Sequence, residues 1–354
     1  MSGTILITGG AGFIGANLAH RLVALGEEVR LLDNLSRPDA ERNVAWLRDQ
    51  HGSRFELVVG DVRDPAMVRA AVRGVDQVFH FAAQVAVSSS LVDPSHDFEV
   101  NARGTLHVLE AIRREPAPPG LVFASTTKVY GALDDVRLTK KATRYEPQDD
   151  PARTHGISEA RPLSFHAPHG CSKGAADQYV LDAAHSHGID AVVFRLSTVY
   201  GPRQRGTEDQ GWVAHLLTRA LRGEDLVVYG DGRQVRDILY VDDLVDALVR
   251  TRTRLEALGG RAFNVGGGTN NAFSVLELVD TIEELLHVRP NLTLEPWRRA
   301  DRRWFVSDTR ELSAMTGWSV KTPAREGLAR LLEWLREDLG ERKRSRPLPF
   351  EVQP

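Results

Sequence analysis

Three glycines with the spacing of a dinucleotide-binding turn lie near the start of the chain. Gly9, Gly12 and Gly15 follow a short apolar run at residues 4–8 and precede a segment with the apolar spacing of a helix. Glycines at such a junction let the backbone turn tightly and approach a pyrophosphate, which then lies at the positive end of the helix dipole. Asp33 ends the next apolar run, about 20 residues further on, as this kind of site requires. The pattern predicts a site for an adenine dinucleotide.

Acidic residues after the second and third apolar runs bear on which dinucleotide binds. Asp33 is expected to accept hydrogen bonds from the adenosine ribose and to repel a 2′-phosphate, which favours NAD over NADP. Arg37 lies close by in the sequence and could compensate for that repulsion. Asp61 has two interpretations. It is either an adenine contact or the N-cap of a helix that begins near Pro65, for which Asp64 is the better residue.

Several further strings of residues match a known family. They are residues 82–84, Asn101, residues 125–131, residues 172–173 and residues 230–237. With the glycine turn, they resemble the extended short-chain dehydrogenase/reductases, the NAD-dependent epimerases and dehydratases that modify nucleotide sugars. The less common strings, at residues 126–131, 170–179, 209–213 and 301–306, are most similar to the members that epimerise C2 of CDP-linked deoxyhexoses. The resemblance runs from residue 4 to about residue 338.

The resemblance implies catalysis by transient oxidation of the sugar to a keto intermediate, with NAD retained through the cycle. In the family, a tyrosine removes the hydroxyl proton, and a lysine four residues later lowers the pKa of that tyrosine. Thr126 matches the family's hydroxyl residue and Lys173 matches its lysine. His169, however, stands where the tyrosine is expected.

The histidine in place of a tyrosine leaves three hypotheses. Imidazole titrates near neutrality in its unperturbed state, so His169 can act as the general base at pH 7. The Lys173 ammonium would disfavour the imidazolium and keep the base form, although the ring reaches less far than a phenol. In the second hypothesis, oxidation is slowed or moved to another residue. In the third, the protein binds its ligands without turnover.

The resemblance also assigns the residues that would contact the two ligands. Cofactor contacts are expected from Gly9, Gly12, Phe13, Ile14, Gly15, Asp33, Asn34, Asp61, Val62, Ala82 and Lys173. Substrate contacts are expected from Gln84, Thr127, Lys128, Gln210, Arg236 and Arg298. The two arginines would hold the diphosphate, because a planar guanidinium can bond two phosphate oxygens at once. The alternatives are surface ion pairs of Arg236 with Asp237 and of Arg298 with Asp301, and a solvated loop position for Lys128.

Other reactive patterns are not supported. Thr127 and Lys128 replace the Asp-Glu pair that sugar 4,6-dehydratases carry after the hydroxyl residue, so dehydration is not expected. The histidines at positions 80, 166, 169 and 185 lack a metal-ligand spacing with carboxylates or cysteines, and no metal site is predicted. His80 lies in an apolar run and is interpreted as a core residue. Cys171 is too near His169 in sequence to face it on a helix.

The elements that must position these residues alternate as in an α/β protein. Strands are predicted at residues 4–8, 28–33, 55–59, 77–81, 121–125 and 191–196, with helical spacing between most of them. Such alternation predicts a doubly wound parallel sheet, a Rossmann fold, with helices on both faces. A smaller α/β substrate lobe is predicted from a strand at residues 226–229 and helices at residues 212–222, 242–254, 274–286 and 323–339.

These patterns divide the chain into two predicted domains. Residues 1–200 form the NAD-binding domain, in which residues 131–168 are a long loop without regular structure that could cover a site. Residues 201–340 form mainly the substrate-binding lobe, and residues 341–354 form a loose tail.

Composition limits the partners. The 354 residues carry 45 lysines and arginines against 48 acidic residues, a net charge of −3, which argues against nucleic acid as a ligand. No stretch approaches the roughly 18 apolar residues that a membrane span needs. The single cysteine fits the reducing cytoplasm. A homodimer through a helix pair that includes residues 170–187 is expected from the resemblance.

The sequence thus predicts an NAD-dependent epimerase of a nucleotide-linked sugar that acts at C2 of a CDP-deoxyhexose. One alternative is a C4-epimerase of a UDP-sugar. An alternative of another class is a non-catalytic protein that binds NAD and a nucleotide sugar, because His169 replaces the family tyrosine.

Overall fold

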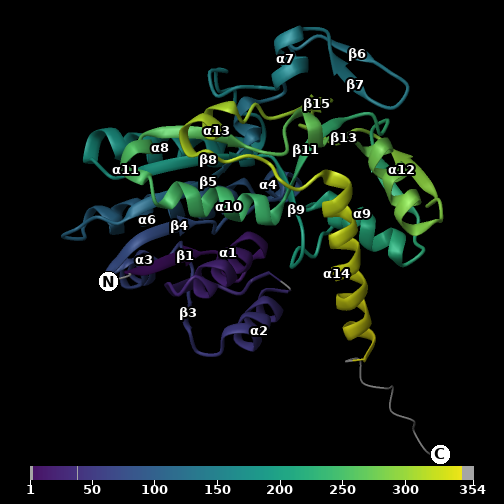
Figure 1. The fold of residues 1–354 in the computed structure, drawn as a ribbon. Helices are drawn as coiled ribbons and strands as arrows, with labels where there is room; N and C mark the ends of the chain where they lie inside the picture. Colours follow the sequence, from purple (N-terminus) through teal and green to yellow (C-terminus); the bar gives the residue numbers. More distant parts are fainter. Residues whose placement is uncertain (1–2, 38, 345–354) are drawn as a thin grey trace, which may run out of the picture.

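A parallel sheet forms the centre of the computed structural model, which describes residues 3–37 and 39–344 (Figure 1). Within these ranges it has seven strands in the order β12-β8-β5-β4-β1-β2-β3. They are β1 (Thr4–Thr8), β2 (Glu28–Asp33), β3 (Phe55–Val59), β4 (Val75–His80), β5 (Gly120–Thr126), β8 (Ala191–Leu196) and β12 (Arg261–Val265). The strand order reverses between β1 and β4, and ligands of such sheets bind outside the carboxyl ends of the strands at that reversal.

The structure confirms the doubly wound sheet and most of the predicted strand bounds. Strands β1, β2, β3 and β8 begin and end at the predicted residues. Strand β4 begins two residues before the predicted run and ends one before it, and β5 is one residue longer at each end. Strand β12 was not predicted, because Arg261 and Asn264 interrupt its apolar run.

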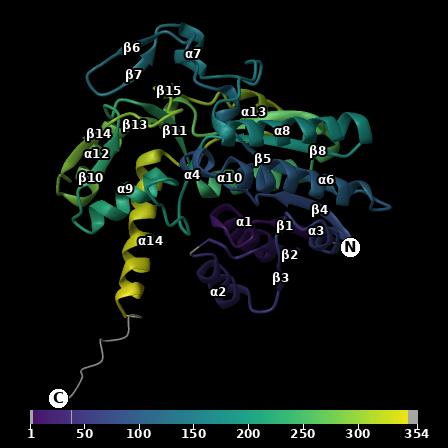
Figure 2. The ribbon, with the colours of Figure 1, turned by 180° about the vertical axis from the view of Figure 1, so that it is seen from behind.

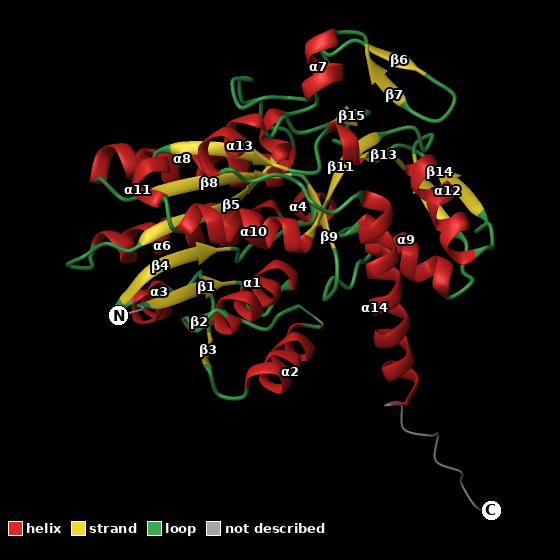
Figure 3. Cartoon of the chain, in the orientation of Figure 1, coloured by secondary structure: helices red, strands yellow, loops and turns green. Residues whose placement is uncertain are grey.

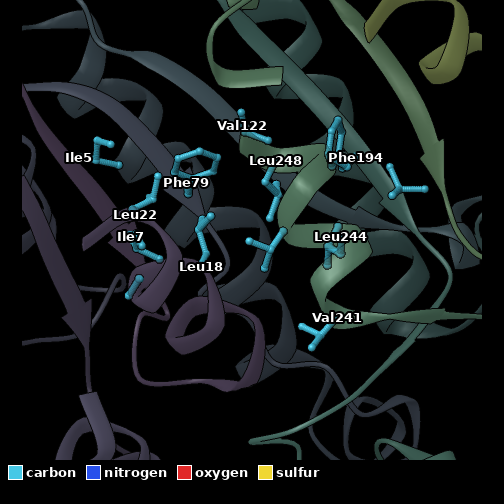
Figure 4. Close-up of a cluster of buried hydrophobic side chains, with 14 of the residues drawn as sticks. Ile5, Ile7, Leu18, Leu22, Phe79, Val122, Phe194, Val241, Leu244 and Leu248 are labelled. Atoms are coloured by element: carbon cyan, nitrogen blue, oxygen red, sulfur yellow. The ribbon is translucent and has the colours of Figure 1, made fainter. Parts of the chain in front are cut away.

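Helices cover both faces of the sheet (Figures 1, 2 and 3). One face carries α1 (Phe13–Ala24), α2 (Ala40–His51) and α10 (Val241–Arg252), and the other carries α3 (Pro65–Val72), α6 (Gly104–Arg113) and α8 (Ala167–His187). Successive residues of a strand point to opposite faces. Ile5 and Ile7 therefore pack with Leu18 and Leu244 on the first face (Figure 4). Leu6 packs into the second face. Burial on both faces holds the carboxyl end of β1 in a fixed position.

A smaller assembly follows at the carboxyl side of the sheet. Strand β11 (Val235–Tyr240) pairs with β9 (Thr198–Tyr200), β13 (Ala272–Ser274) and β15 (Trp304–Phe305), while β10 (Leu226–Tyr229) pairs with β14 (Leu292–Glu295). Helices α9 (Trp212–Leu221), α12 (Val275–Leu286) and α14 (Ala324–Arg344) share one apolar core with β10 and β11. Ser274 and Glu277 form a capping box that starts α12.

Parts of the chain beyond residue 200 belong to the sheet domain rather than to this lobe. Helix α10 packs on α1, and β12 extends the sheet beside β8. The short helices α11 (Leu255–Leu258) and α13 (Arg310–Thr316) lie on the same side, and Leu312 belongs to the core of that face. The chain therefore crosses between the two parts more than once.

The segment at residues 131–168 differs from the prediction of a loop without regular structure. It contains the hairpin of β6 (Leu138–Lys140) and β7 (Tyr145–Pro147) and the short helix α7 (Asp150–His155), which project together at the top of Figure 1. Leu133 and Ile157 pack with Tyr130 and Phe305, so this segment is anchored by a small apolar cluster that it shares with β15. Its elements are too short and too polar to give a period in the sequence.

The end of the chain is helical further than predicted. Helix α14 continues to Arg344, so residues 341–344 of the predicted loose tail belong to a helix. The remainder of the predicted tail, residues 345–354, lies outside the described residues. Among residues 3–37 and 39–344, no helix has both the length and the apolar character needed to cross a bilayer.

Candidate functional site

The glycine turn between β1 and α1 has the shape of a cradle for a pyrophosphate. Gly9 has a φ of 69°, and a Cβ atom there would lie 2.7 Å from the backbone nitrogen of Ala82. A Cβ on Gly15 would lie 2.3 Å from the carbonyl oxygen of Gly9. Gly12 is the N-cap of α1 and offers no side-chain acceptor to the first amides of the helix. These unshielded amides at a helix N-terminus fit the pyrophosphate of NAD.

Asp33 lies at the carboxyl end of β2, beside this turn. Its two carboxylate oxygens accept the backbone amides of Ala11 and Leu35, each at 2.9 Å. Burial raises the pKa of Asp33, and the two amide bonds act against that rise. The carboxylate is thus fixed in direction and retains free lone pairs for two ribose hydroxyl groups.

Asp61 is not the cap of the following helix. Asp64 caps α3 by accepting the amides of Ala66 and Met67, which confirms it as the better cap. Asp61 instead accepts the guanidinium of Arg63 and, at 2.8 Å, the amide of Asn34. The Arg63 guanidinium holds the pKa of Asp61 well below its usual range. Asn34 and Asp61 therefore form one polar edge on the side of the cradle where an adenosine would lie.

The floor of the proposed cofactor site lies between β1, β4 and α6 and is formed by Val62, Ala82 and His80. Val62 is buried, and the amide of Ala82 donates to the hydroxyl of Thr8 at 3.3 Å. His80 is fully buried between the hydroxyls of Thr8 and Thr105, at 2.6 and 3.0 Å. Burial lowers the pKa of His80 to about 3, so its ring is neutral. This confirms His80 as a core residue.

The end of β5 carries Thr126, Thr127 and Lys128. Thr126 is the N-cap of the short helix η2 (Thr127–Tyr130), and its hydroxyl accepts the amide of Lys128 at 3.2 Å. Thr127 is buried, and its carbonyl oxygen accepts the guanidinium of Arg302 at 2.9 Å. Burial, with the charges of Arg302 and Arg236, lowers the pKa of Lys128 to about 7. Lys128 is therefore not the solvated loop cation of the alternative interpretation.

His169 and Lys173 lie one turn apart at the start of α8, where Pro168 favours helix initiation. Both are nearly inaccessible, at 5% and 4% exposure. The ammonium of Lys173 lies 4.1 Å from the centre of the Phe123 ring, and burial lowers its pKa to about 7. Burial also lowers the pKa of His169, and the charge of Lys173 acts in the same direction. The imidazole is therefore neutral and in its base form at pH 7.

A buried polar cluster beside His169 was not found from the sequence. It consists of Asp97 and Asn101, one turn apart on a continuous helical stretch, together with Ser172 and the half-buried Gln84 from two other segments. The backbone amide of Gln84 donates to the side-chain oxygen of Asn101 at 3.0 Å, and the side-chain amide of Asn101 donates to the carbonyl oxygen of Gln84 at 2.9 Å. The side-chain amides of both residues also donate to Asp97. Gln84 thus holds protein groups in this structure rather than facing an open space. Only the long-range packing of α5 (Pro94–Phe98) on α8 brings Asp97 here.

One cavity of about 790 Å³ joins the start of α1 to the C-terminal lobe. Of the predicted residues, it is lined by Phe13, Ile14, Lys128, Gln210, Arg236 and Arg298. Helix α4 (Val87–Val92) contributes Val87, Ser88 and Leu91 to its wall. His169 contacts the same helix through Ser90, whose hydroxyl accepts the His169 amide at 3.2 Å. His169, Thr126 and Lys173 thus lie beside the lining of the cavity rather than in it.

Arg236 projects from β11 into a cluster of charges. Its guanidinium bonds Asp301 at 2.5 Å and the carbonyl oxygen of Arg302, so its ion partner is Asp301 and not the adjacent Asp237. Burial favours the neutral form of Asp301, but the charges of Arg236 and Lys128 outweigh it and lower the pKa of this carboxyl. The charged groups of Arg236, Lys128 and Arg302 thus lie close to Asp301 at the cavity wall.

Arg298 is held at the outer end of the same cavity. Its guanidinium bonds Glu208 at 2.9 Å and lies 3.8 Å from the centre of the Tyr229 ring. Its ion partner is therefore Glu208 rather than Asp301. Gln210 closes a tight backbone bridge with Thr207, and Trp212 both lines the cavity and packs on the core of the lobe.

Two glutamines that sequence reasoning missed also line this cavity. The amide nitrogen of Gln204 donates to Val199, and that of Gln234 donates to Tyr229, which fixes the orientation of both side chains. Their Oε1 atoms are buried and accept no hydrogen bond from the described residues. Buried polar atoms are rarely left unbonded, so these oxygens are acceptors available to a ligand.

The described residues hold no group of three or more His, Cys, Asp or Glu side chains that could bind a metal ion. Cys171 is exposed, unlike its neighbour His169.

Comparisons with known proteins show the family and agree with the fold. The model of the NAD dependent epimerase/dehydratase family matches residues 5–266. The chain is 39% identical over 337 residues to CDP-paratose 2-epimerase of Salmonella typhi, which covers 93% of this chain and 98% of that protein. It is 32% identical to UDP-glucose 4-epimerase of Mycolicibacterium smegmatis, over 94% of this chain and 98% of the relative. The solved Thermus thermophilus UDP-glucose 4-epimerase in complex with NAD superimposes with a TM-score of 0.78 at 32% identity, covering 94% of this chain and 99% of that one.

Proposed function

This chain belongs to the NAD dependent epimerase/dehydratase family, and from that membership we propose that it epimerises C2 of a CDP-linked deoxyhexose. It is an NAD-dependent enzyme by family. The observation that carries the proposal is the cavity that runs without interruption from Phe13 and Ile14, at the start of α1, to Arg236 and Arg298. The choice of CDP and of C2 is supported by the greater identity to CDP-paratose 2-epimerase, 39%, than to a UDP-glucose 4-epimerase, 32%.

The cofactor site is supported by the fit of the glycine cradle. Gly9, Gly12 and Gly15 with the start of α1 would hold the pyrophosphate, and Asp33 would bond the adenosine ribose. Asn34, Asp61 and Val62 would border the adenine, with Ala82 at the floor and Lys173 toward the nicotinamide ribose. NAD, when bound, supplies an acceptor for a hydride from the sugar carbon. The charge of Arg37 lowers the pKa of Asp33, which favours the carboxylate that would bond the ribose, and the family membership supports NAD as the cofactor.

His169 is the proposed general base. As the sugar carbon is oxidised to the ketone, the hydroxyl proton passes to the neutral imidazole, and it returns to the same oxygen when the carbon is reduced from its other face. The lowered pKa of His169 keeps the ring able to accept a proton at neutral pH. Its position beside the cavity, rather than in the lining, requires the substrate or one water molecule to bridge the remaining gap.

Thr126, Lys173 and Lys128 support this proton transfer. The hydroxyl of Thr126 lies at the end of β5, one residue before the buried Thr127, and is the second group able to bond the sugar hydroxyl. Lys173 and Lys128 are cations that burial makes easy to deprotonate, with pKa values of about 7. Positive charge on either one disfavours the imidazolium and helps return the proton to the sugar oxygen.

The diphosphate would lie between Arg236 and Arg298, with the nucleoside toward Gln210. Each arginine has a carboxylate partner in this structure, Asp301 and Glu208 respectively. A diphosphate offers a stronger acceptor to each guanidinium and would share these cations or displace the carboxylates. Thr127 and Lys128 in place of a carboxylate pair leave no acid and base for water elimination, which supports epimerisation over dehydration.

The test is to purify the protein, measure its bound NAD, and incubate it with a CDP-linked deoxyhexose or a UDP-hexose. Proton NMR follows the configuration of each sugar carbon. The expected result is inversion at C2 of the CDP-sugar, with deuterium placed at C2 retained at that carbon in the product. Inversion at C4 of the UDP-sugar alone would favour the C4-epimerase. Bound NAD with no change in any sugar would favour the non-catalytic binding protein.

A homodimer is part of the same proposal. Helices α5, α6 and α8 pack together and expose Phe98, Leu106 and Tyr179. Such apolar side chains on adjacent helices are typical of a surface that a second copy covers. Sedimentation equilibrium should give the mass of two chains, and Tyr179→Glu should shift it toward one. A mass of one chain for the unaltered protein would contradict the dimer.

A further inference from the structure

Asp97 is a fully buried carboxylate that the proposed chemistry does not yet use. It lies on α5, and three protein groups donate to it: the hydroxyl of Ser172, the amide of Asn101 at 3.1 Å and the amide of Gln84 at 3.2 Å. Asn101 and Gln84 donate to Oδ1 of this carboxylate, and Ser172 donates to Oδ2. A buried carboxylate is costly unless it is bonded, and these three donors supply that bonding.

The ring of His169 lies next to Oδ1, the oxygen that also accepts Asn101 and Gln84. The Nδ1 atom of His169 lies 3.6 Å from Oδ1 of Asp97, slightly longer than a hydrogen bond. This Nδ1 is buried and bonds no other described group. Hydrogen bonds of catalytic groups are often long in the free protein and shorten when ligands bind. The His169 backbone is already anchored, because its amide donates to Ser90.

We propose that Asp97 is a positioning residue that keeps the proton of neutral His169 on Nδ1, so that Nε2 carries the lone pair that accepts the sugar proton. This inference rests on the proposed function of His169. A neutral imidazole has one N–H, and a carboxylate acceptor next to Nδ1 selects the tautomer with the proton on that nitrogen. When the sugar hydroxyl gives its proton to Nε2, the ring becomes a cation beside the Asp97 anion. The same proton leaves Nε2 again when the ketone is reduced, so no proton is lost.

The charges around His169 make this carboxylate necessary. Lys173 on α8 and Lys128 on η2 both disfavour the imidazolium, and burial does so more strongly. Helix α4 carries no charged side chain, and its Ser90 bonds the backbone amide of His169. Among the groups that face His169, Asp97 alone favours the protonated ring. Without it, the buried imidazole would be too weak a base to hold the proton during the oxidation step.

The direct test is the tautomer of His169 in the unaltered protein with NAD bound. Nitrogen-15 NMR of histidine-labelled protein distinguishes protonated from free ring nitrogens, and the signal missing from His169→Gln identifies the residue. The expected result is a neutral ring with the proton on Nδ1 and a free Nε2. A ring with the proton on Nε2 would overturn the proposal, whether or not any sugar is turned over. The sugar assay described above tests the proposed function separately.

Two variants measure the contribution of the charge. Asp97→Asn is nearly isosteric and should lower the pKa of His169 by about one to three units, because an opposite charge at this range is lost. The acidic limb of the kcat profile should move to lower pH by the same amount, and kcat should fall on the order of 10²-fold. Ser90→Ala removes a neutral anchor and should leave the pKa of His169 unchanged.

If Asp97 has only a structural role, Asp97→Asn would leave the pKa of His169 unchanged as well, and that result would also overturn the proposal. If Asp97→Asn does not fold, the tautomer of the unaltered protein decides the matter alone.

Discussion

Replacing Arg236 with glutamine separates binding of the diphosphate from stabilisation of the fold. Arg236 bonds Asp301 at 2.5 Å, and its side chain is only 12% exposed. Arg236→Gln therefore removes a proposed diphosphate contact and also leaves Asp301 without its closest cation. The double variant Arg236→Gln/Asp301→Asn removes both charges. If Arg236 serves the ligand, the double variant recovers stability but does not recover nucleotide binding.

The expected magnitudes follow from the two surroundings of the guanidinium. A hydrogen bond to a charged group contributes about 1.5–3 kcal/mol, so loss of one diphosphate contact of about 2 kcal/mol weakens binding about 30-fold. Breaking a buried ion pair costs about 3–5 kcal/mol. Asp301 is 24% exposed and Lys128 still lies close to it, so we expect about 2 kcal/mol for the single variant.

Two assays on the NAD-loaded protein give these quantities. Calorimetry measures the Kd for CDP and for UDP, and urea denaturation measures the free energy of unfolding. Both variants should bind the nucleoside diphosphates about 30-fold more weakly, and only the single variant should lose stability. Binding that recovers fully in the double variant would refute the reasoning, because Arg236 would then act only through its pair with Asp301.

Two further predictions concern the cofactor site and a buried lysine. Gly15→Ala should abolish retention of NAD, because its Cβ would lie 2.3 Å from the carbonyl oxygen of Gly9. The control Gly340→Ala, with open space around it, should leave the NAD content of the purified protein unchanged. Equal NAD contents in the two variants would contradict this account of the turn. For Lys173, the pKa is lowered from 10.5 to about 7 in the folded protein, so the unfolded chain binds more protons between these values and stability rises with pH. In urea titrations without NAD, the unaltered protein should gain about 1.4 kcal/mol per pH unit relative to Lys173→Met in this interval, and parallel pH profiles would show that the lysine is not held neutral.

The sequence predicted those parts of the fold that depend on local patterns. Strands β1, β2, β3 and β8 are short apolar runs with glycine or polar residues at their ends, and their bounds were correct. Asp64 was identified as a helix cap because the residue types that cap helices act on amides two or three positions away. Strand β12 was missed, because polar residues within it hide a strand that is buried only through its place in the sheet.

The candidate site was predicted less completely, because its contacts join distant segments. His169 and Asp97 are 72 positions apart, and only the packing of α5 on α8 brings them within 3.6 Å. The ion partners of Arg236 and Arg298 were expected among sequence neighbours, but they are Asp301 and Glu208, supplied by separate loops. A single sequence carries no local signal for such pairs.

The central claim is that a buried imidazole replaces a phenol as the base in this enzyme. The most direct measurement is the rate at which His169→Phe interconverts the two C2 epimers of a CDP-linked deoxyhexose, compared with the unaltered protein at equal NAD content. The account predicts a loss of at least about 10²-fold, since general base catalysis contributes on that order. A variant that retains NAD and interconverts the epimers at an undiminished rate would contradict it.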